Sequence, residues 1–169
     1  MSRPRPEAAQ QVRQRRDEAL NALTEGVPYI RFLGIRFDRR GDELTALLPF
    51  DDMLIGNPML PALHGGVTAA FLEVTAIVVL SWHIALRKME NGHRAVDEWD
   101  MKHLPRMPKT IDFSTDYLRS GLPRDAYARA SVNRSGRRYA SVQVEAWQDN
   151  RARLFAQGTG HFLMPVADG

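Results

Sequence analysis

The segment LPALHGGVTAAFLEVTAIVVL, residues 60–80, decides the architecture of this chain. His64 and two glycines open it, an apolar run from Val67 to Leu80 follows, and a single acid, Glu73, lies inside that run. If the run is a helix, it is apolar nearly all round and should be surrounded by protein on most sides. A sheet wrapped around the helix would provide those surroundings.

Glu73 has no cationic neighbour along this predicted helix. The positions three and four residues away from it hold Ala69, Ala70, Ala76 and Ile77. None of these can pair with a carboxylate. Glu73 must therefore find a partner elsewhere or face water in a cleft, and a carboxylate in a cleft is a candidate reactive group. The alternative is a purely structural carboxylate that accepts hydrogen bonds from backbone amides.

The composition limits the class of protein. With 169 residues, 44% of them apolar and 25% charged, the chain is most simply one domain with a substantial core. It has no cysteine, which excludes disulfides, zinc–thiolate sites and cysteine nucleophiles. The apolar run is shorter than the roughly 20 residues of a membrane-spanning helix. Because the N-terminal segment is also polar, we expect a cytoplasmic protein that does not associate with a membrane.

The charge pattern argues against nucleic acid as a partner. The net charge is +3, but basic and acidic residues are interleaved along the chain. Residues 1–25 hold five arginines and four acids, which describes a nearly neutral helix rather than a basic patch. A mildly positive surface suits an anionic small molecule equally well.

Periodicity predicts an α+β domain with an antiparallel sheet. Residues 7–25 should form an N-terminal helix that Gly26 and Pro28 end, and the long apolar helix should run from about residue 65 to 87. Strands are expected at residues 35–38, 43–50, 111–117, 126–132, 140–146 and 153–164.

These elements suggest a simple division of the chain. We expect an N-terminal helical extension, residues 1–26, and a main domain, residues 27–169. Within the main domain, residues 88–109 form a connection long enough to be either a lid or a surface insertion.

His64, Gly65 and Gly66 stand where the long helix should begin. Glycines let the backbone approach a ligand closely, and the first amides of a helix have no partner within it, so they can hold a carbonyl oxygen that gains negative charge. The glycines could equally serve only to form a tight turn. For His64 we favour bracing the turn or helping to position a substrate carbonyl. The other histidines show no metal-ligand spacing, and we expect no metal.

Glu73 lies nine residues after His64, which is about 13 Å along a helix axis. One copy of the chain would therefore keep the glycine amides and the carboxylate apart. A site shared between two subunits would bring them together, with the amides of one copy facing the carboxylate of the other.

The chain resembles the hotdog-fold thioesterases of the phenylacetic-acid-degradation type. Five segments carry this resemblance: LIGNPMLPALHGGVTAAFLEVTA, VPYIRFLGIRF, IDFSTDYLRSG, GRRYASVQVEAWQ and LFAQGTGHFLMP. The resemblance covers residues 27–165, and HGG followed by an acid, then DYLR and GRR, is fairly specific to that family. It implies an antiparallel sheet wrapped around a central helix, with protomers paired edge to edge as homodimers or homotetramers. It also implies hydrolysis of an acyl-CoA or aryl-CoA thioester without a cofactor.

The resemblance also implies roles for particular residues. The oxyanion-binding amide would come from Gly65 and Gly66, most of all from Gly66, and Glu73 of the opposite subunit would act as nucleophile or as general base for water. Asn57 matches the asparagine that orients the attacking water or the carbonyl, and Thr110 matches a hydroxyl early in the strand after the helix. The candidates for binding CoA phosphates are Arg137, Arg138, Arg119 and Arg134.

Some features depart from the family or leave alternatives open. Many relatives carry Asp in place of Glu73, and the longer side chain could shift the mechanism between direct attack and activation of water. The connection 88–109 either caps the acyl pocket, with Trp99 and Met101 setting the preferred chain length, or is a surface insertion. The sequence does not specify the acyl group.

Two other functions fit the same fold. One is an acyl-CoA binding or sensing protein without turnover. The other is a hydratase or dehydratase, which is disfavoured because in those enzymes the histidine lies in a longer, proline-rich loop well before the acid.

Overall fold

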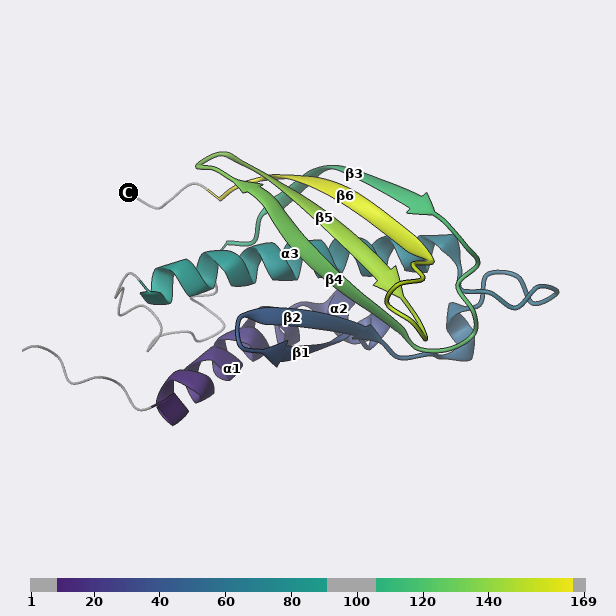
Figure 1. The fold of residues 1–169 in the computed structure, drawn as a ribbon, viewed down its shortest axis with the longest axis horizontal. Helices are drawn as coiled ribbons and strands as arrows, with labels where there is room; N and C mark the ends of the chain where they lie inside the picture. Colours follow the sequence, from purple (N-terminus) through teal and green to yellow (C-terminus); the bar gives the residue numbers. More distant parts are fainter. Residues whose placement is uncertain (1–8, 91–105, 166–169) are drawn as a thin grey trace, which may run out of the picture.

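The computed structural model describes residues 9–90 and 106–165. Along this part of the chain the elements are α1 (Ala9–Glu25), α2 (Pro28–Leu33), β1 (Arg36–Arg40), β2 (Glu43–Leu48), η1 (Asp52–Leu54), α3 (Gly65–Glu90), β3 (Lys109–Tyr117), β4 (Ala126–Ser135), β5 (Tyr139–Trp147) and β6 (Ala156–Leu163). The strands form one antiparallel sheet and α3 is its central helix, so the predicted α+β class is confirmed (Figure 1).

The sheet has the strand order β1-β2-β4-β5-β6-β3, and each neighbouring pair is antiparallel. Figure 1 shows β3 to β6 curving over one side of α3, while α1 and the β1–β2 hairpin lie below the helix. β3 precedes β4 in the chain but pairs with β6, so it forms one edge of the sheet. The predicted wrapping of a sheet around a long helix is the arrangement observed.

Helix α3 begins at the glycine pair, as predicted, and ends at Glu90. By length and composition it could cross a membrane, but 61% of its most apolar window is buried inside the protein, which is typical of a core helix. Phe71, Val78 and Trp82 are among its most deeply buried side chains. The indole N–H of Trp82 donates to the carbonyl of Asp42 at 3.0 Å, so this large core residue also has its polar atom satisfied.

Strand β6 leaves room for a large side chain of its neighbour β3 because two of its buried positions are glycines. Strand β6 buries every second residue, in the period-two pattern of a strand with one covered face, and two of these positions are Gly158 and Gly160. A Cβ at Gly160 would lie 2.7 Å from Cδ2 of Phe113 and 2.6 Å from Cε2 of Phe162. The glycines therefore make room for Phe113, which reaches into the core from the edge strand β3.

The N-terminal helix α1 ends at Glu25, as predicted, and its Ala19, Leu20 and Leu23 are buried in the same core as α3 and the sheet. Two ion pairs fix it to the β1–β2 hairpin. Arg39 donates to Asp17 at 2.7 Å and Arg16 donates to Asp42 at 2.6 Å.

Helix α2 is not among the elements predicted from the sequence. It begins at Pro28, because a proline in the first turn lacks only an N–H that would be unpaired anyway. It ends at Gly34, which has the left-handed φ of 68° that favours glycine. The same proline that helps to end the first helix therefore starts the second.

Several boundaries differ from the prediction. β6 begins at Ala156 rather than at residue 153, because the residues before it form the loop that ends in the buried Phe155. The helix and strand on either side of the long connection extend into it, to Glu90 and from Lys109. Trp99 and Met101, which would set the preferred chain length if the connection caps the acyl pocket, lie outside the described residues.

Candidate active site

The turn before α3 is braced by its own histidine. The Gly66 N–H donates to Nδ1 of His64 at 2.8 Å, so the ring caps the first turn of the helix, a role that serine and asparagine side chains often fill. Because Nδ1 accepts this bond, the neutral ring carries its proton on Nε2. His64 itself is exposed, which leaves this Nε2–H accessible to a ligand.

Gly65 is tied to the edge of the sheet. Tyr117, the last residue of β3, donates its hydroxyl to the carbonyl of Gly65 at 2.8 Å. A Cβ at Gly65 would lie 3.5 Å from the tyrosine ring, which is an ordinary contact. Tyr117 therefore fixes the position of the first residue of α3 relative to the end of the edge strand β3.

The two glycine amides differ in availability. The family resemblance implies the Gly66 amide as the oxyanion donor, but here that N–H donates to His64. Over residues 9–90 and 106–165, no hydrogen-bond partner is found for the Gly65 N–H, which is the first amide of the helix. In this conformation Gly65 is therefore the glycine whose amide is without a partner among the described residues.

Neighbouring loops hold the turn formed by His64, Gly65 and Gly66, here called the glycine turn, in place. The backbone N–H of His64 donates to the carbonyl of Leu54, and that of Leu63 donates to the carbonyl of Gly121, both at 2.8 Å. The loop at Gly56 approaches so closely that a Cβ there would lie 2.9 Å from Cα of His64. The turn is thus packed between two loops and is preorganised before any ligand arrives.

Asn57 follows that close contact, so the structure places its loop beside His64. The side chain, however, closes a local turn, because its Oδ1 accepts the N–H of Met59 at 3.0 Å. The side-chain NH2 group is the part of Asn57 that remains to act on a carbonyl or a water.

Glu73 lies on the open face of α3. It is half-buried, and Gly66, Ala69, Ala70 and Ile77, at helical spacing around it, are likewise not fully buried. In the described part of the chain its carboxylate forms neither a hydrogen bond nor an ion pair. It lies eight residues after Gly65, about 12 Å along the helix axis. A single copy therefore does not bring the carboxylate to the glycine amides.

Thr110 lies at the opposite end of the edge strand from the turn. It pairs with Phe162 near the start of β3, whereas Tyr117, at the end of β3, contacts Gly65. Within one copy Thr110 and the glycine turn are separated by most of the length of β3.

The four arginine candidates fall into two groups. Arg119 follows Tyr117 and lies at the same end of the sheet as the glycine turn. The other three lie at the far end, where the β4–β5 turn meets the start of β3, and they surround a hollow of about 390 Å³. These are Arg134, Arg137 and Arg138. A single copy cannot use both groups on one small ligand.

No metal cluster is found in the part of the chain that the structure describes, in the sense of three or more His, Asp or Glu side chains close enough to share an ion.

Tyr117 was not predicted as a site residue. It belongs to the quoted segment DYLR, but at the end of an alternating strand it has the pattern of an ordinary strand residue. Only the fold shows that its hydroxyl reaches the start of α3.

Comparison with known proteins supports a single family. The family model described as thioesterase superfamily matches residues 60–154, more than half of the chain. The chain is 33% identical over 139 residues to the medium/long-chain acyl-CoA thioesterase YigI of Escherichia coli (strain K12), a match that covers 82% of this chain and 86% of YigI.

Solved structures show the same fold. A protein from Shewanella oneidensis related to the thioesterase superfamily superposes with a TM-score of 0.70 at 25% identity, covering 94% of this chain and 100% of that one. A phenylacetic acid degradation-related protein from Ralstonia eutropha gives a TM-score of 0.63 at 20% identity, covering 86% and 99%. The resemblance found in the sequence is thereby confirmed.

Proposed function

This chain belongs to the thioesterase superfamily, and from that premise we propose that it hydrolyses acyl-coenzyme A with a medium or long acyl chain to the fatty acid and free coenzyme A. The names of its relatives support the acyl-CoA substrate, and the match to YigI extends over 82% of the chain. The chain length of the acyl group, which the sequence leaves open, is proposed from the same relatives.

The observation that carries the proposal is the unpaired carboxylate of Glu73 on the open face of α3. A carboxylate that is half-buried and has no partner among the described residues is free to act as a base or nucleophile, as groups at functional sites do. Hydrolysis of a thioester needs both such a base or nucleophile and an amide that stabilises the oxyanion. The glycine turn supplies the amide, but about 12 Å away in the same copy.

A second copy would complete the site. β3 is a nine-residue edge strand, and its Ile111 and Tyr117 are 57% and 56% exposed, so it offers a long, partly apolar edge for pairing. Antiparallel pairing of two β3 strands about a two-fold axis would continue the sheet and lay the two α3 helices side by side in opposite directions. The small Ala69 and Ala70 would let the helices approach, so that Gly65 of one copy faces Glu73 of the other.

The chemistry follows from these groups. In the direct route a carboxylate oxygen of Glu73 attacks the carbonyl carbon, the C–S bond breaks, and the CoA thiolate leaves and takes up a proton. Water then hydrolyses the mixed anhydride. In the other route Glu73 takes a proton from water as that water attacks, and the proton passes to the departing sulfur. In both routes the Gly65 N–H stabilises the oxyanion, and the Gly66 N–H can join it if the His64 ring turns aside.

The remaining candidates would position the substrate. The Asn57 side-chain amide and Thr110 of the opposite copy would orient the water or the carbonyl, and arginines would hold the CoA phosphates.

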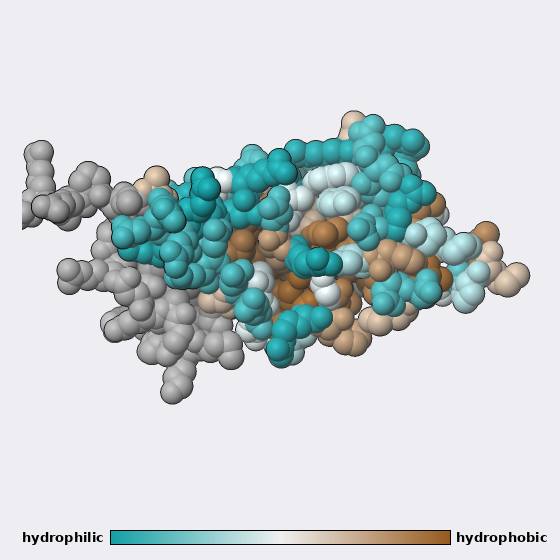
Figure 2. Space-filling view, turned by 90° about the horizontal axis from the view of Figure 1, so that it is seen from below, coloured by the Kyte–Doolittle hydropathy of each residue, from teal (hydrophilic) through white to brown (hydrophobic). Residues whose placement is uncertain are grey.

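Figure 2, which views the molecule from the side away from β3 to β6, shows apolar residues gathered in the middle of this face. An apolar region of this kind suits both an acyl chain and a second copy.

The test is thiol release from a panel of acyl-CoAs with short, medium, long and aryl acyl groups. Wild-type protein should release thiol fastest from medium or long chains, and Glu73→Ala should lower turnover by orders of magnitude. Glu90→Ala, an exposed acid on the same helix, is the matched control and should behave as wild type. Saturable binding of acyl-CoA without release from any member of the panel would instead favour a non-catalytic binding protein.

A further inference from the structure

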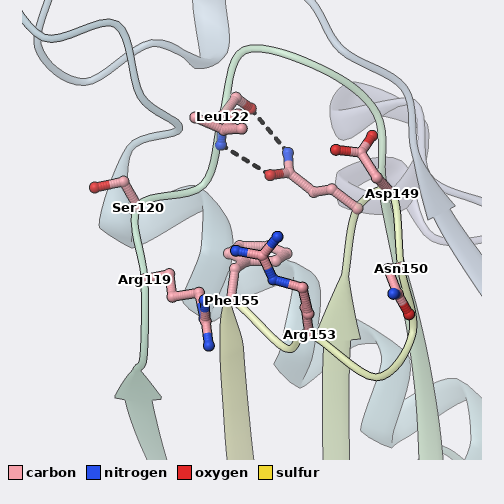
Figure 3. Close-up of a pocket in the computed structure, with 8 residues that line it drawn as sticks. Arg119, Ser120, Leu122, Asp149, Asn150, Arg153 and Phe155 are labelled. Atoms are coloured by element: carbon pink, nitrogen blue, oxygen red, sulfur yellow. Dashed lines mark hydrogen bonds between the residues drawn. The ribbon is translucent and has the colours of Figure 1, made fainter.

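A small pocket lies at the end of the sheet that carries the glycine turn. Its volume is about 120 Å³, and it is formed by the loop after β3 and the loop before β6 (Figure 3). Its lining residues are Arg119, Ser120, Leu122, Gln148, Asp149, Asn150, Arg153 and Phe155. Arg119 comes from the first loop and Arg153 from the second, and Figure 3 shows Arg119 beside Phe155 and the Arg153 side chain over the Phe155 ring.

The charges around this pocket favour an anion. In the described part of the chain, neither the Arg119 nor the Arg153 side chain has an ion-pair partner. The one acid in the lining, Asp149, accepts from Arg124 at 2.5 Å, so it already has a cationic partner outside the lining. Two arginines without a counter-charge in the described part of the chain thus line the same small pocket.

The polar groups around the pocket are suited to donate hydrogen bonds. Asn150 uses its Oδ1 to accept the N–H of Ala152 at 2.9 Å, which leaves its NH2 group as a donor. The Gln148 side chain is engaged with Leu122 at the rim of the pocket. It accepts from the Leu122 N–H at 2.9 Å and donates to the Leu122 carbonyl at 2.8 Å. The dashed lines in Figure 3 mark these two bonds. The rim is therefore held in shape, and the Asn150 NH2 group remains available as a donor.

The pocket is linked to the glycine turn by direct packing. Phe155 is 4% exposed, and a Cβ at Gly121 would lie 3.1 Å from its Cε2 and 3.2 Å from Cβ of Leu63. Leu63 immediately precedes His64, and its N–H donates to the carbonyl of Gly121. Phe155, in the pocket wall, thus packs through Gly121 against the residue that leads into the glycine turn.

We propose that the pocket between Arg119 and Arg153 binds one phosphate group of the coenzyme A moiety. The inference rests on the proposed function for the identity of the ligand. A volume of about 120 Å³ has room for a phosphate and a few of its waters but is below the 300 Å³ or so of a site that encloses a whole ligand. Arg153, which no pattern in the sequence singles out, therefore joins Arg119 as a specificity residue for the CoA ester.

The first test is calorimetric binding of free CoA to the full-length protein. Arg119→Ala and Arg153→Ala should each weaken binding roughly tenfold, since a hydrogen bond to a charged group contributes about 1.5 kcal/mol or more. Arg151→Ala is the matched control, because this arginine lies in the same loop but is directed over the Trp147 ring, 5.3 Å from its centroid. It should bind CoA as wild type does. Unchanged CoA affinity in both pocket variants would overturn the proposal.

A gain of binding provides a second arm. Asp149→Asn removes the acid and frees Arg124, so it should tighten CoA binding several-fold, an effect that a merely structural role of the loop does not predict. Weaker CoA binding in this variant would contradict the proposal. Binding of 3′-dephospho-CoA identifies which phosphate is bound. If Arg153→Ala no longer weakens binding of dephospho-CoA, the pocket holds the 3′-phosphate. If Arg153→Ala still weakens it, the pocket holds the diphosphate. Equal affinity for CoA and for pantetheine, which has no nucleotide phosphates, would overturn the assignment to CoA.

Kinetics separate this inference from the proposed function. Arg153→Ala should raise KM for an acyl-CoA about tenfold with little change in kcat, and should leave hydrolysis of the matching acyl-pantetheine, which has no nucleotide phosphates, as in wild type. Equal losses on both substrates would overturn the inference while leaving a thioesterase. Conversely, arginine-dependent CoA binding in a protein that hydrolyses no thioester would overturn the proposed function and leave the phosphate site.

Discussion

The hydroxyl of Tyr117 donates to the carbonyl of Gly65 at 2.8 Å, and this single bond joins the end of the edge strand β3 to the start of the central helix α3. The strand is the edge through which we propose pairing with a second copy, and the helix start carries the unpartnered Gly65 amide. The contact therefore couples the position of the proposed oxyanion donor to the proposed interface between copies.

Removal of this hydroxyl should impair catalysis without unfolding the protein. A neutral hydrogen bond contributes about 1 kcal/mol, so we expect Tyr117→Phe to lower kcat/KM for an acyl-CoA about fivefold. Tyr139→Phe is the control, because Tyr139 is exposed and stacks on His161 without contacting the turn. Wild-type kinetics in Tyr117→Phe would show that the bond does not position the amide.

The His64 cap should contribute to stability. Loss of a side chain that caps a helix costs about 1 kcal/mol, so His64→Ala should lower the free energy of unfolding by that amount in urea titrations. His64→Asn should retain most of it, since asparagine is a favoured capping residue. Equal losses in the two variants would mean that the ring stabilises the turn by something other than the bond to Gly66.

Gly160 should tolerate no side chain. Because a Cβ there would lie 2.6 Å from Phe162 and 2.7 Å from Phe113, Gly160→Ala should destabilise the protein by about 1–3 kcal/mol, measured as a lower urea midpoint. Gly65→Ala is the comparison for stability, since its Cβ would be at an ordinary 3.5 Å from Tyr117. A neutral Gly160→Ala would argue against the close packing of β3 on β6 described above.

Much of the fold could be predicted from local pattern. The alternation at residues 126–132 and 140–146 identified β4 and β5, and the apolar run around Glu73 identified α3, because burial on one face or on all sides leaves a periodic trace in sequence. Helix α2 left no such trace, since its six residues are too few for a period and its proline is also a helix-stop signal.

The site was less predictable because its contacts are long-range. His64 and its two glycines are adjacent in the sequence, so a helix entrance with open amides could be expected there. The bond from Tyr117 to Gly65 spans 52 residues, and the pocket between Arg119 and Arg153 depends on two loops that only the sheet brings together. Which of the two glycine amides is open depends on the rotamer of His64, which no spacing rule specifies.

Pairing through β3 should depend on the character of its edge. Ile111→Lys places a charge on an exposed position of that strand, and we expect it to shift the protein towards monomer in sedimentation experiments and to reduce thiol release in parallel. Asn133→Lys on β4, also exposed but away from this edge, should leave the assembly intact. Full activity in a monomeric Ile111→Lys protein would contradict a site shared between copies.

The most direct test of the central claim is complementation between two inactive variants. Glu73→Gln removes the reactive carboxylate, and Gly65→Pro removes only the amide donor at a position where proline suits the first turn of a helix. If each site takes its amide from one copy and its carboxylate from the other, an equal mixture of the two variants, unfolded and refolded together, should regain about a quarter of wild-type thiol release, because half of the dimers are mixed and each holds one intact site. A mixture no more active than the average of its two components would contradict the shared site.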